Sequence, residues 1–176
     1  MFKKKLSQID GIYFSKIVDQ TSKQISNFYN DKPFPNYKNE ENLISFLERG
    51  NKNLFIKNIK DHIGLGKKIL EVGCGTGQVS NYLAAQTNNE IIGLDLGINS
   101  LNLAKSFADK NNISNVSFVH GDLFDEIFEK ESFDFIYCSG VLHHTDNPQK
   151  GFKNLVKLLK PNGYIVIGLY NWYGRL

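Results

Sequence analysis

Cysteine is scarce in this sequence, and long hydrophobic runs are absent. Cys74 and Cys138 are the only cysteines among the 176 residues, and without a CxxC pair they support neither a disulfide framework nor a zinc site. No window approaches the roughly 18 apolar residues of a membrane span. The basic start MFKKKLSQIDG also lacks the apolar core of a signal peptide. We therefore expect a cytoplasmic protein with no metal and no membrane partner.

A strong charge of one sign is also missing. The net charge is +3, and the lysines are scattered rather than gathered with arginines and aromatics into one stripe, so nucleic acid is not indicated as a partner. Hydrophobic residues make up 41% and charged residues 22% of the chain, a composition typical of folded proteins. At this length we expect one main hydrophobic core.

From Ile69 onward, short apolar runs alternate with segments of helical period. This pattern is typical of an α/β fold, with a mainly parallel sheet flanked by helices. Five strands, rich in β-branched and aromatic residues, are predicted at 69–73, 90–95, 116–120, 134–139 and 164–170. The helices between them are predicted at about 77–87, 99–111 and 148–159.

Two of these helices carry an apolar stripe that we expect to pack on the sheet. One stripe consists of Leu101, Ala104 and Ala108. The other consists of Phe152, Leu155, Val156 and Leu159. The residues KPNG at 160–163 then predict a turn, because proline and asparagine suit its central positions, and the strand at 164–170 follows at once.

Residues 1–64 have a different pattern. Apolar residues recur at helical spacing from Phe14 to Phe28, two prolines interrupt the pattern at 31–37, and a second apolar face follows at 55–63. We predict a helical N-terminal cap over residues 1–64, followed by a domain that spans residues 65–176.

The run ILEVGCGTGQVS at 69–80 ends a predicted strand and opens a helix. Gly73, Gly75 and Gly77 allow a sharp turn and a close approach of a ligand to the backbone. Dinucleotide-binding proteins carry G-x-G-x-x-G at this place, but the position of the third glycine is Gln78. An NAD-dependent dehydrogenase is therefore the less favoured alternative.

Three carboxylates are expected around the same crevice. Asp95 closes the second predicted strand, where a carboxylate can accept from both hydroxyls of a ribose. Asp122 follows the third strand, where it can accept from the exocyclic amine of adenine, and Glu71 lies within the first strand. Such a ring attracts a ligand with an ammonium and a sulfonium group and repels a pyrophosphate. These residues favour S-adenosylmethionine as the cofactor.

The chain resembles the class I S-adenosylmethionine-dependent methyltransferases over about residues 65–170. Five segments carry the resemblance in the family's order: EVGCGTG at 71–77, GLDLG at 93–97, GDL at 121–123, FDFIYCSGVLHHTDNP at 133–148 and LLKPNGYIVIG at 158–168. The resemblance implies a Rossmann-like three-layer sandwich with strand order 3-2-1-4-5. It also implies a cofactor that lies across the switch point between the first and fourth strands.

The resemblance further implies which residues contact the cofactor. They are Glu71, Gly73, Cys74, Gly75 and Gly77 around the methionine portion, Asp95 and Leu96 at the ribose, Asp122 and Leu123 at the adenine, and Ser139 and Gly140 on the opposite wall. The N-terminal cap is expected to contact the acceptor. Tyr29 or Tyr37 is expected over the sulfonium, since an aromatic ring attracts a cation.

His143 and His144 follow the fourth predicted strand. Adjacent histidines are expected to point in different directions, and no carboxylate cluster accompanies them, so a metal site is not predicted. In the resembling family, histidines of this loop lie near the methyl-transfer site. His144 is therefore the candidate general base, with loop packing as the alternative.

Methyl transfer is an in-line displacement that needs a base only when the nucleophile carries a proton. The segment CSGV at 138–141 lacks the Asn/Asp-Pro-Pro-aromatic pattern of enzymes that methylate nucleic-acid bases, which favours a small-molecule acceptor. The resembling family adds further strands after the fifth. We therefore expect a truncated chain without the sixth and seventh strands, and a missing C-terminal segment or a partner at the fifth-strand edge. A truncated S-adenosylmethionine-binding module without catalysis is the alternative.

Overall fold

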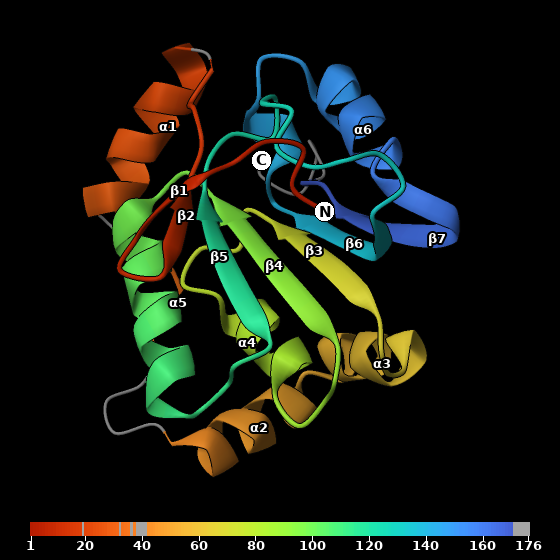
Figure 1. Ribbon diagram of the computed structural model, residues 1–176. Helices are drawn as coiled ribbons and strands as arrows, with labels where there is room; N and C mark the ends of the chain where they lie inside the picture. The colour runs from red at the N-terminus through yellow and green to blue at the C-terminus, as the bar shows by residue number, and fades with distance from the viewer. Residues whose placement is uncertain (19, 32, 36, 38–41, 171–176) are drawn as a thin grey trace.

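A computed structural model shows one twisted sheet with helices on both faces (Figure 1). It describes residues 1–18, 20–31, 33–35, 37 and 42–170, and the side chains of residues 25 and 28–31 lie outside that description. The strands run in the order β1-β2-β5-β4-β3-β6-β7. All neighbouring pairs are parallel except β1 and β2. Within the residues so described, no helix is long and apolar enough to cross a bilayer.

The centre of the sheet follows the prediction. Its strands are β3 (Lys68–Val72), β4 (Glu90–Asp95), β5 (Val116–His120), β6 (Phe133–Ser139) and β7 (Leu159–Gly168). The connecting elements are α4 (Gln78–Ala84), α5 (Ile98–Lys110), the 3-10 helix η1 (Leu142–His144) and α6 (Pro148–Val156). The order β5-β4-β3-β6-β7 confirms the expected 3-2-1-4-5 arrangement of a Rossmann-like fold.

The N-terminal region is not purely helical. Strands β1 (Ser7–Ile9) and β2 (Ile12–Phe14) precede the helices α1 (Gln20–Asp31), α2 (Leu43–Lys52) and α3 (Leu54–Ile63). Phe14, which was predicted in a helix, pairs instead with His120 of β5. Ile12 and Phe14 also fit the period of a strand, and the Asp10-Gly11 pair, with φ angles of 50° and 79°, makes the hairpin turn. The helical spacing was misleading because this turn signal was overlooked.

The prediction that the sixth and seventh strands are absent is wrong, because β1 and β2 bring the sheet to seven strands. They lie at the β5 edge rather than beside β7, and they come from residues 7–14. The expected truncation after the fifth strand is therefore not supported. The prediction failed because it counted only the strands that follow the glycine loop.

The turn predicted at residues 160–163 belongs to β7 instead. Leu159 pairs with Phe133 and Tyr164 pairs with Phe135, so four residues of β7 (160–163) lie opposite a single residue of β6, Asp134. Asn162 has a φ of 66° within this irregularity. The proline and asparagine therefore mark a bulge in the strand and not a reversal of the chain.

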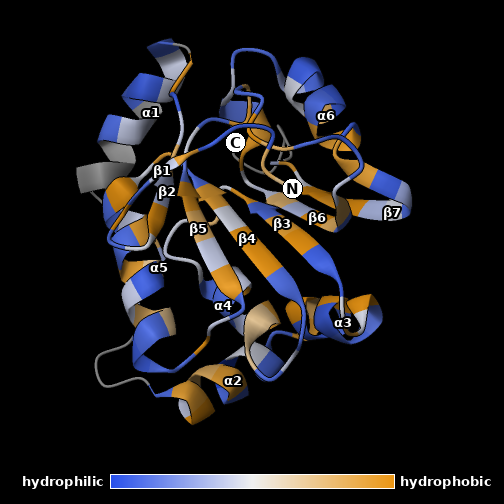
Figure 2. Ribbon diagram, in the orientation of Figure 1, coloured by the Kyte–Doolittle hydropathy of each residue, from blue (hydrophilic) through white to orange (hydrophobic). Residues whose placement is uncertain are grey.

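Apolar side chains form one layer on each face of the sheet, and hydrophobic colouring runs along much of the central strands (Figure 2). Helices α2 to α5 cover one face, where Leu101, Ala104 and Ala108 are buried as predicted. Helix α6 and the segment 121–132 cover the other face. Only part of the predicted α6 stripe reaches this core, since Leu155 is buried while Phe152 and Val156 are 42% and 43% exposed. Because the central strands are buried on both faces, their carboxyl ends, which carry the site, are held in place.

Lys60 of α3 closes the C-terminus of α4. Its ammonium donates to the carbonyls of Tyr82 at 2.6 Å and Ala85 at 2.8 Å, which a helix end leaves without intrahelical partners. We expect Lys60→Met to lower the free energy of unfolding by about 1–2 kcal/mol, because two partly buried charge-assisted hydrogen bonds are lost. Urea denaturation measures this loss.

The matched control lies on the same helix. Lys57 pairs with Asp61 one turn away at the surface, and exposed pairs of this kind contribute little. Lys57→Met should therefore leave the free energy of unfolding nearly unchanged. Equal losses in the two variants would contradict the capping role of Lys60.

Candidate functional site

The backbone turns sharply where β3 meets α4. Gly73, Gly75 and Gly77 have φ angles of 69°, 52° and 70°, in the left-handed region that favours glycine. The amides of Gly73 and Cys74 donate to the carbonyl of Leu94 at 2.8 and 3.2 Å. These bonds tie the glycine loop (residues 73–77) to the end of β4.

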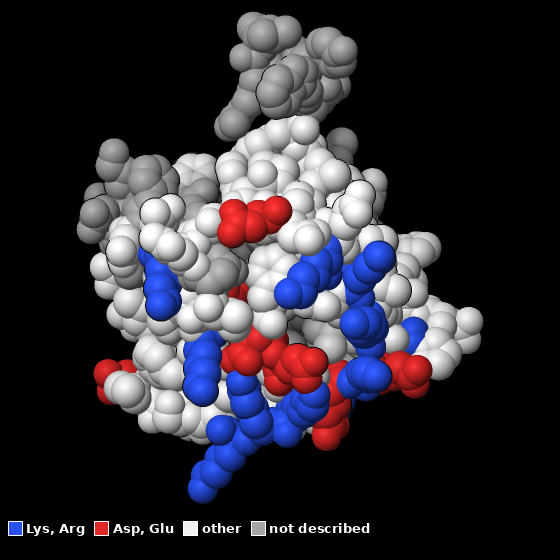
Figure 3. Space-filling view, turned by 90° about the horizontal axis from the view of Figure 1, so that it is seen from above, with Lys and Arg blue, Asp and Glu red and all other residues white. Residues whose placement is uncertain are grey.

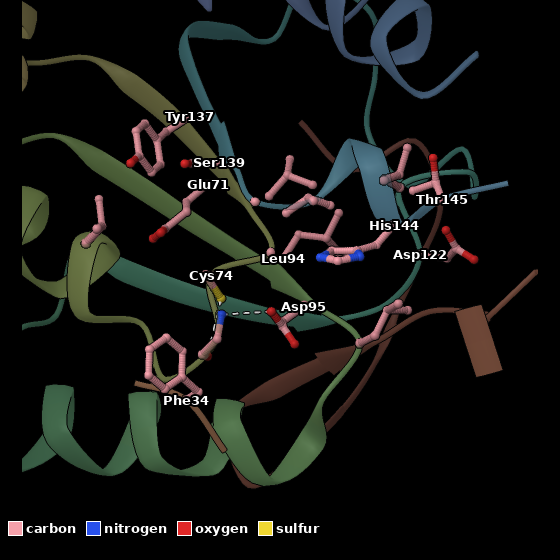
Figure 4. A pocket seen from close by; sticks show the side chains of 18 of the residues that line it. Phe34, Glu71, Cys74, Leu94, Asp95, Asp122, Tyr137, Ser139, His144 and Thr145 are labelled. Carbon is pink, nitrogen blue, oxygen red and sulfur yellow. Dashed lines mark hydrogen bonds between the residues drawn. The ribbon is translucent and has the colours of Figure 1, made fainter. Parts of the chain in front are cut away.

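A cavity of about 330 Å³ opens beside this loop at the carboxyl ends of the central strands, a size within the usual range of ligand sites. It brings together all the predicted cofactor residues except Gly77, which faces α5 and β5. The predicted residues that line it are Glu71, Gly73, Cys74, Gly75, Asp95, Leu96, Asp122, Leu123, Ser139 and Gly140. Figure 4 shows Glu71, Cys74 and Asp95 close together in this cavity.

Asp95 shapes the glycine loop and also borders the cavity. One carboxylate oxygen accepts from the amide of Gly75 and the other from the amide of Gly97, both at 2.7 Å (Figure 4 draws the first bond). Burial raises the pKa of Asp95, and the hydrogen bonds from backbone amides oppose that rise. Each oxygen retains a lone pair for a further donor, such as a hydroxyl group.

Glu71 is a carboxyl group inside the sheet, only 4% exposed. The hydroxyl of Ser80 donates to it. Burial raises the pKa of Glu71 to about 8, and the bonds from Ser80 offset part of that rise. In the free protein the group therefore holds a proton at neutral pH, and a nearby cation favours its ionised form.

Asp122 has a structural role that the sequence did not predict. Its carboxylate accepts from the amide of Val18 at 3.2 Å and from that of Phe124 at 2.9 Å. It is 1% exposed and borders the cavity. Asp122 thus joins the segment before α1 to the segment after β5, next to the position expected for adenine.

Several lining residues were missed by sequence reasoning: Ser22, Phe34, Pro35, Tyr137, Thr145 and Tyr170. Phe34 and Pro35 lie directly on the glycine loop, because the carbonyl of Pro35 accepts from the hydroxyl of Thr76 and from the side-chain amide of Gln78. Their only sequence signal was the proline pair in DKPFPNY, which predicted a break in a helix. The rings of Phe34 and Tyr170 remain 71% and 54% exposed at the cavity.

Of the two tyrosines expected over the sulfonium, Tyr37 lies elsewhere. Tyr37 does not line the cavity, and its ring stacks on Phe107 with centroids 4.2 Å apart. Its hydroxyl donates to the carbonyl of Thr76 at 2.8 Å, so Tyr37 supports the glycine loop by packing. The side chain of Tyr29 lies outside the described residues.

The two histidines converge at the cavity. His144 lines it, and the Nε2 atoms of His143 and His144 are 3.1 Å apart. The prediction that adjacent imidazoles point in different directions is therefore wrong, because the tight turn of η1 lets both rings swing to one side. In the part of the chain that the structure describes, no group of three or more His, Cys, Asp or Glu residues could hold a metal ion.

The ionisable side chains that line the cavity include several acidic ones. Among the described residues that line it, Glu71, Asp95 and Asp122 are acidic and none is lysine or arginine. On the molecular surface above, lysine and arginine side chains are interspersed with acidic ones (Figure 3). The cavity itself therefore favours cationic or uncharged groups over anions.

Known proteins with similar sequences include methyltransferases. Residues 63–174 match a family described as methyltransferase domain. The sterol 24-C-methyltransferase erg6 of Aspergillus fumigatus is 32% identical over 108 residues, which cover 61% of this chain and 28% of that protein. A ubiquinone biosynthesis O-methyltransferase of Coxiella burnetii is 34% identical over 119 residues, covering 66% and 49%. The chain thus spans about a quarter to a half of these relatives.

Solved structures share the fold. The [4+2]-cyclase SpnF superposes with a TM-score of 0.69 at 17% identity over 86% of this chain and 61% of its own, which shows the fold alone. A Haemonchus contortus N-methyltransferase, solved with phosphomonomethylethanolamine and S-adenosylhomocysteine, has a TM-score of 0.61 at 25% identity over 71% and 31%.

Proposed function

Because this chain belongs to the methyltransferase-domain family, with S-adenosylmethionine as its cofactor, we propose that it transfers a methyl group to a small-molecule acceptor. The observation that carries the proposal is the cavity in which Glu71, Asp95 and Asp122 meet beside the glycine loop. Three carboxylates without a lysine or arginine among the described lining residues suit a ligand that carries an ammonium and a sulfonium.

The residues present fit the cofactor portion by portion. The glycine loop and Glu71 would hold the methionine portion, Asp95 the ribose hydroxyls through its remaining lone pairs, and Asp122 with Leu123 the adenine. Ser139 and Gly140 would form the opposite wall. When bound, the cofactor supplies a methyl group on a good leaving group, so the protein mainly has to align the acceptor and exclude water.

The remaining lining residues indicate the chemical class of the methyl acceptor. Phe34 and Tyr170 are exposed aromatic residues that line the cavity, and the ring centroid of Tyr170 lies 6.0 Å from that of His144. Such rings pack best against a flat apolar group. A carboxylated or phosphorylated acceptor would meet three carboxylates with no cationic partner among the described lining residues. We therefore propose an uncharged acceptor with a flat apolar part, and His144 as the general base where the nucleophile carries a proton.

Label transfer tests this function. The full chain, incubated with methyl-labelled S-adenosylmethionine and the small-molecule fraction of a cell extract, should give a labelled organic product, and an Asp95→Ala variant should not. A chain that binds the cofactor but labels nothing would support the alternative, a cofactor-binding module without catalysis. That alternative is motivated by the short span of the relatives that the chain covers.

Cofactor binding should tighten as the pH rises from about 6 to 8. Burial raises the pKa of Glu71 to about 8. At low pH the cationic group of the cofactor must therefore displace the proton of Glu71, whereas at high pH a larger fraction of Glu71 is already ionised. Glu71→Gln should abolish this dependence and weaken binding at pH 8 by about 10-fold, the loss of one charge-assisted hydrogen bond. Calorimetry with S-adenosylhomocysteine over this pH range measures both effects.

The stability of the free protein should respond in the opposite direction. Above the ordinary pKa of 4.5 an unfolded glutamate has released its proton, whereas folded Glu71 keeps it up to about pH 8, so this group destabilises the fold progressively across that window. The Glu71→Gln variant should therefore be at least as heat-stable as the wild type at pH 8. Glu90→Gln, a surface control, should change neither the affinity for S-adenosylhomocysteine nor the heat stability. A pH-independent affinity in the wild type would contradict the role of Glu71.

A further inference from the structure

η1 holds two imidazole rings together beside the cavity. The Nε2 atoms of His143 and His144 are 3.1 Å apart, and the ring centroids are 4.2 Å apart. His144 lines the cavity, whereas His143 stands outside its lining, 4.3 Å from the ring of Tyr170. At this separation one Nε2 must carry a hydrogen and the other a lone pair, since two lone pairs or two N–H groups would repel each other.

The turn that carries the pair is firmly anchored. Leu142 is 3% exposed and packs so closely on α6 that a Cβ atom at Gly151 would lie 2.9 Å from its side chain. The amide and hydroxyl of Thr145 both donate to the carbonyl of Leu142, at 3.1 and 2.8 Å. The imidazoles therefore start from a fixed backbone, which favours a defined contact between them.

We propose that His143 and His144 act as one proton-accepting pair for a hydroxyl acceptor. His144 takes the hydroxyl proton on Nδ1, and the positive charge is shared with His143 across the contact between the Nε2 atoms. The acceptor's O–H bond breaks as its O–CH3 bond forms, the electrons of the donor's S–CH3 bond remain on sulfur, and the proton leaves from the pair to solvent. This inference rests on the proposed function and narrows its acceptor to the hydroxyl class.

An aromatic ring lies against the pair, and acidic groups border the same cavity. The ring of Tyr170 lies against His143 and stabilises an imidazolium by cation–π attraction. The acidic groups that border the same cavity are Asp95 at the end of β4, Asp122 after β5, and Glu71 of β3, which is protonated in the free protein; an ionised carboxylate stabilises a nearby cation. A hydroxyl needs such help because it is a poor nucleophile until its proton is removed.

Nitrogen NMR of the full chain, labelled with ¹⁵N at its histidines, tests the pair in the absence of S-adenosylmethionine and of any methyl acceptor. We expect one protonated and one unprotonated Nε2 joined by a hydrogen bond. We also expect one proton to be taken up by the pair as a unit and a second only at clearly lower pH, because two adjacent imidazolium ions repel. In His143→Phe, His144 should titrate as a single isolated group. Two independent titrations in the wild type, unchanged for His144 in the variant, would overturn the inference.

Kinetics with a hydroxyl acceptor identified by label transfer give the second test. His144→Gln should lower kcat by about 100-fold or more, the usual loss for a general base. His143→Phe should lower kcat by about 10-fold and shift the acid limb of its pH profile, whereas His143→Gln, which keeps a polar partner for His144, should recover part of the loss. An unshifted profile in His143→Phe would overturn the shared-proton role.

Failure of the proposed methyltransferase function and failure of the histidine pair would give different experimental results. S-adenosylhomocysteine should bind to the His143 and His144 variants as tightly as to the wild type, because the variants remove no group assigned to the cofactor. Loss of binding in the wild type would contradict the proposed function. Normal binding together with unaltered pH profiles would contradict only the histidine pair.

Discussion

Asp95→Ala is expected to weaken binding of S-adenosylhomocysteine by about 100-fold, equivalent to about 2.7 kcal/mol. The variant loses the carboxylate that would accept hydrogen bonds from the ribose hydroxyls, and a hydrogen bond to a charged group is worth about 1.5–3 kcal/mol. It also removes the acceptor of the Gly75 and Gly97 amides, which now bond to Asp95 at 2.7 Å. The loss combines weaker ribose contacts with a less ordered glycine loop.

Calorimetry on the folded variants measures this effect. Asp95→Asn keeps one carbonyl oxygen as an acceptor and should lose less, about 10-fold. Asp134→Ala is the matched control, because Asp134 accepts from the amide of Lys68 and the ammonium of Lys160 at the opposite, amino ends of the strands. Its affinity should equal that of the wild type. An Asp95→Ala variant that binds as tightly as the wild type would refute the assignment of the ribose to Asp95.

Gly77→Ala is expected to lower the free energy of unfolding by about 2–5 kcal/mol. Gly77 begins α4 with a φ of 70°. A Cβ atom there would lie 2.6 Å from the Cβ of Ala104 and 2.9 Å from the ring of Phe118. Both neighbours are fully buried, so neither can move without disturbing α5 or β5. The cost therefore includes backbone strain and overpacking.

A second glycine separates these two contributions. Gly64, after α3, has φ and ψ angles of 75° and −149°, and beyond its chain neighbours no heavy atom of the described residues lies within 4 Å of the position of its absent Cβ. Because this backbone region is essentially restricted to glycine, Gly64→Ala should cost backbone strain alone, about 1–3 kcal/mol. Urea denaturation of both variants gives the comparison. A loss of only about 1 kcal/mol in Gly77→Ala, the cost of left-handed backbone strain alone, would contradict a contribution of close packing at Gly77.

The sequence was sufficient to predict the centre of the fold. The five central strands and the lining role of Glu71, Asp95 and Asp122 follow from local patterns, because a glycine-rich turn and polar residues at strand ends mark one edge of a parallel sheet. The strand order was implied by the resemblance to the methyltransferase family. Gly77 was correctly recognised as a turn residue, but it packs on Ala104 and Phe118 and does not line the cavity. The spacing alone does not distinguish these two uses of a glycine.

The remaining features depend on contacts between distant parts of the chain. Phe34 and Pro35 reach the glycine loop from about 40 positions earlier, and Tyr170 meets His143 from the end of β7. No periodicity or short motif encodes such contacts. The β1–β2 hairpin was predictable in principle from Asp10-Gly11, but three-residue strands give too short a pattern to compete with an apparent helical one.

The central claim is that the cavity beside the glycine loop binds S-adenosylmethionine. Its most direct test is a titration of the full wild-type chain with S-adenosylhomocysteine, followed by calorimetry and by the amide NMR signals of residues 73–77, with NADH titrated in parallel. We expect one-to-one binding of S-adenosylhomocysteine, large shifts of these amide signals, and no response to NADH. Binding of NADH with no response to S-adenosylhomocysteine would contradict the claim.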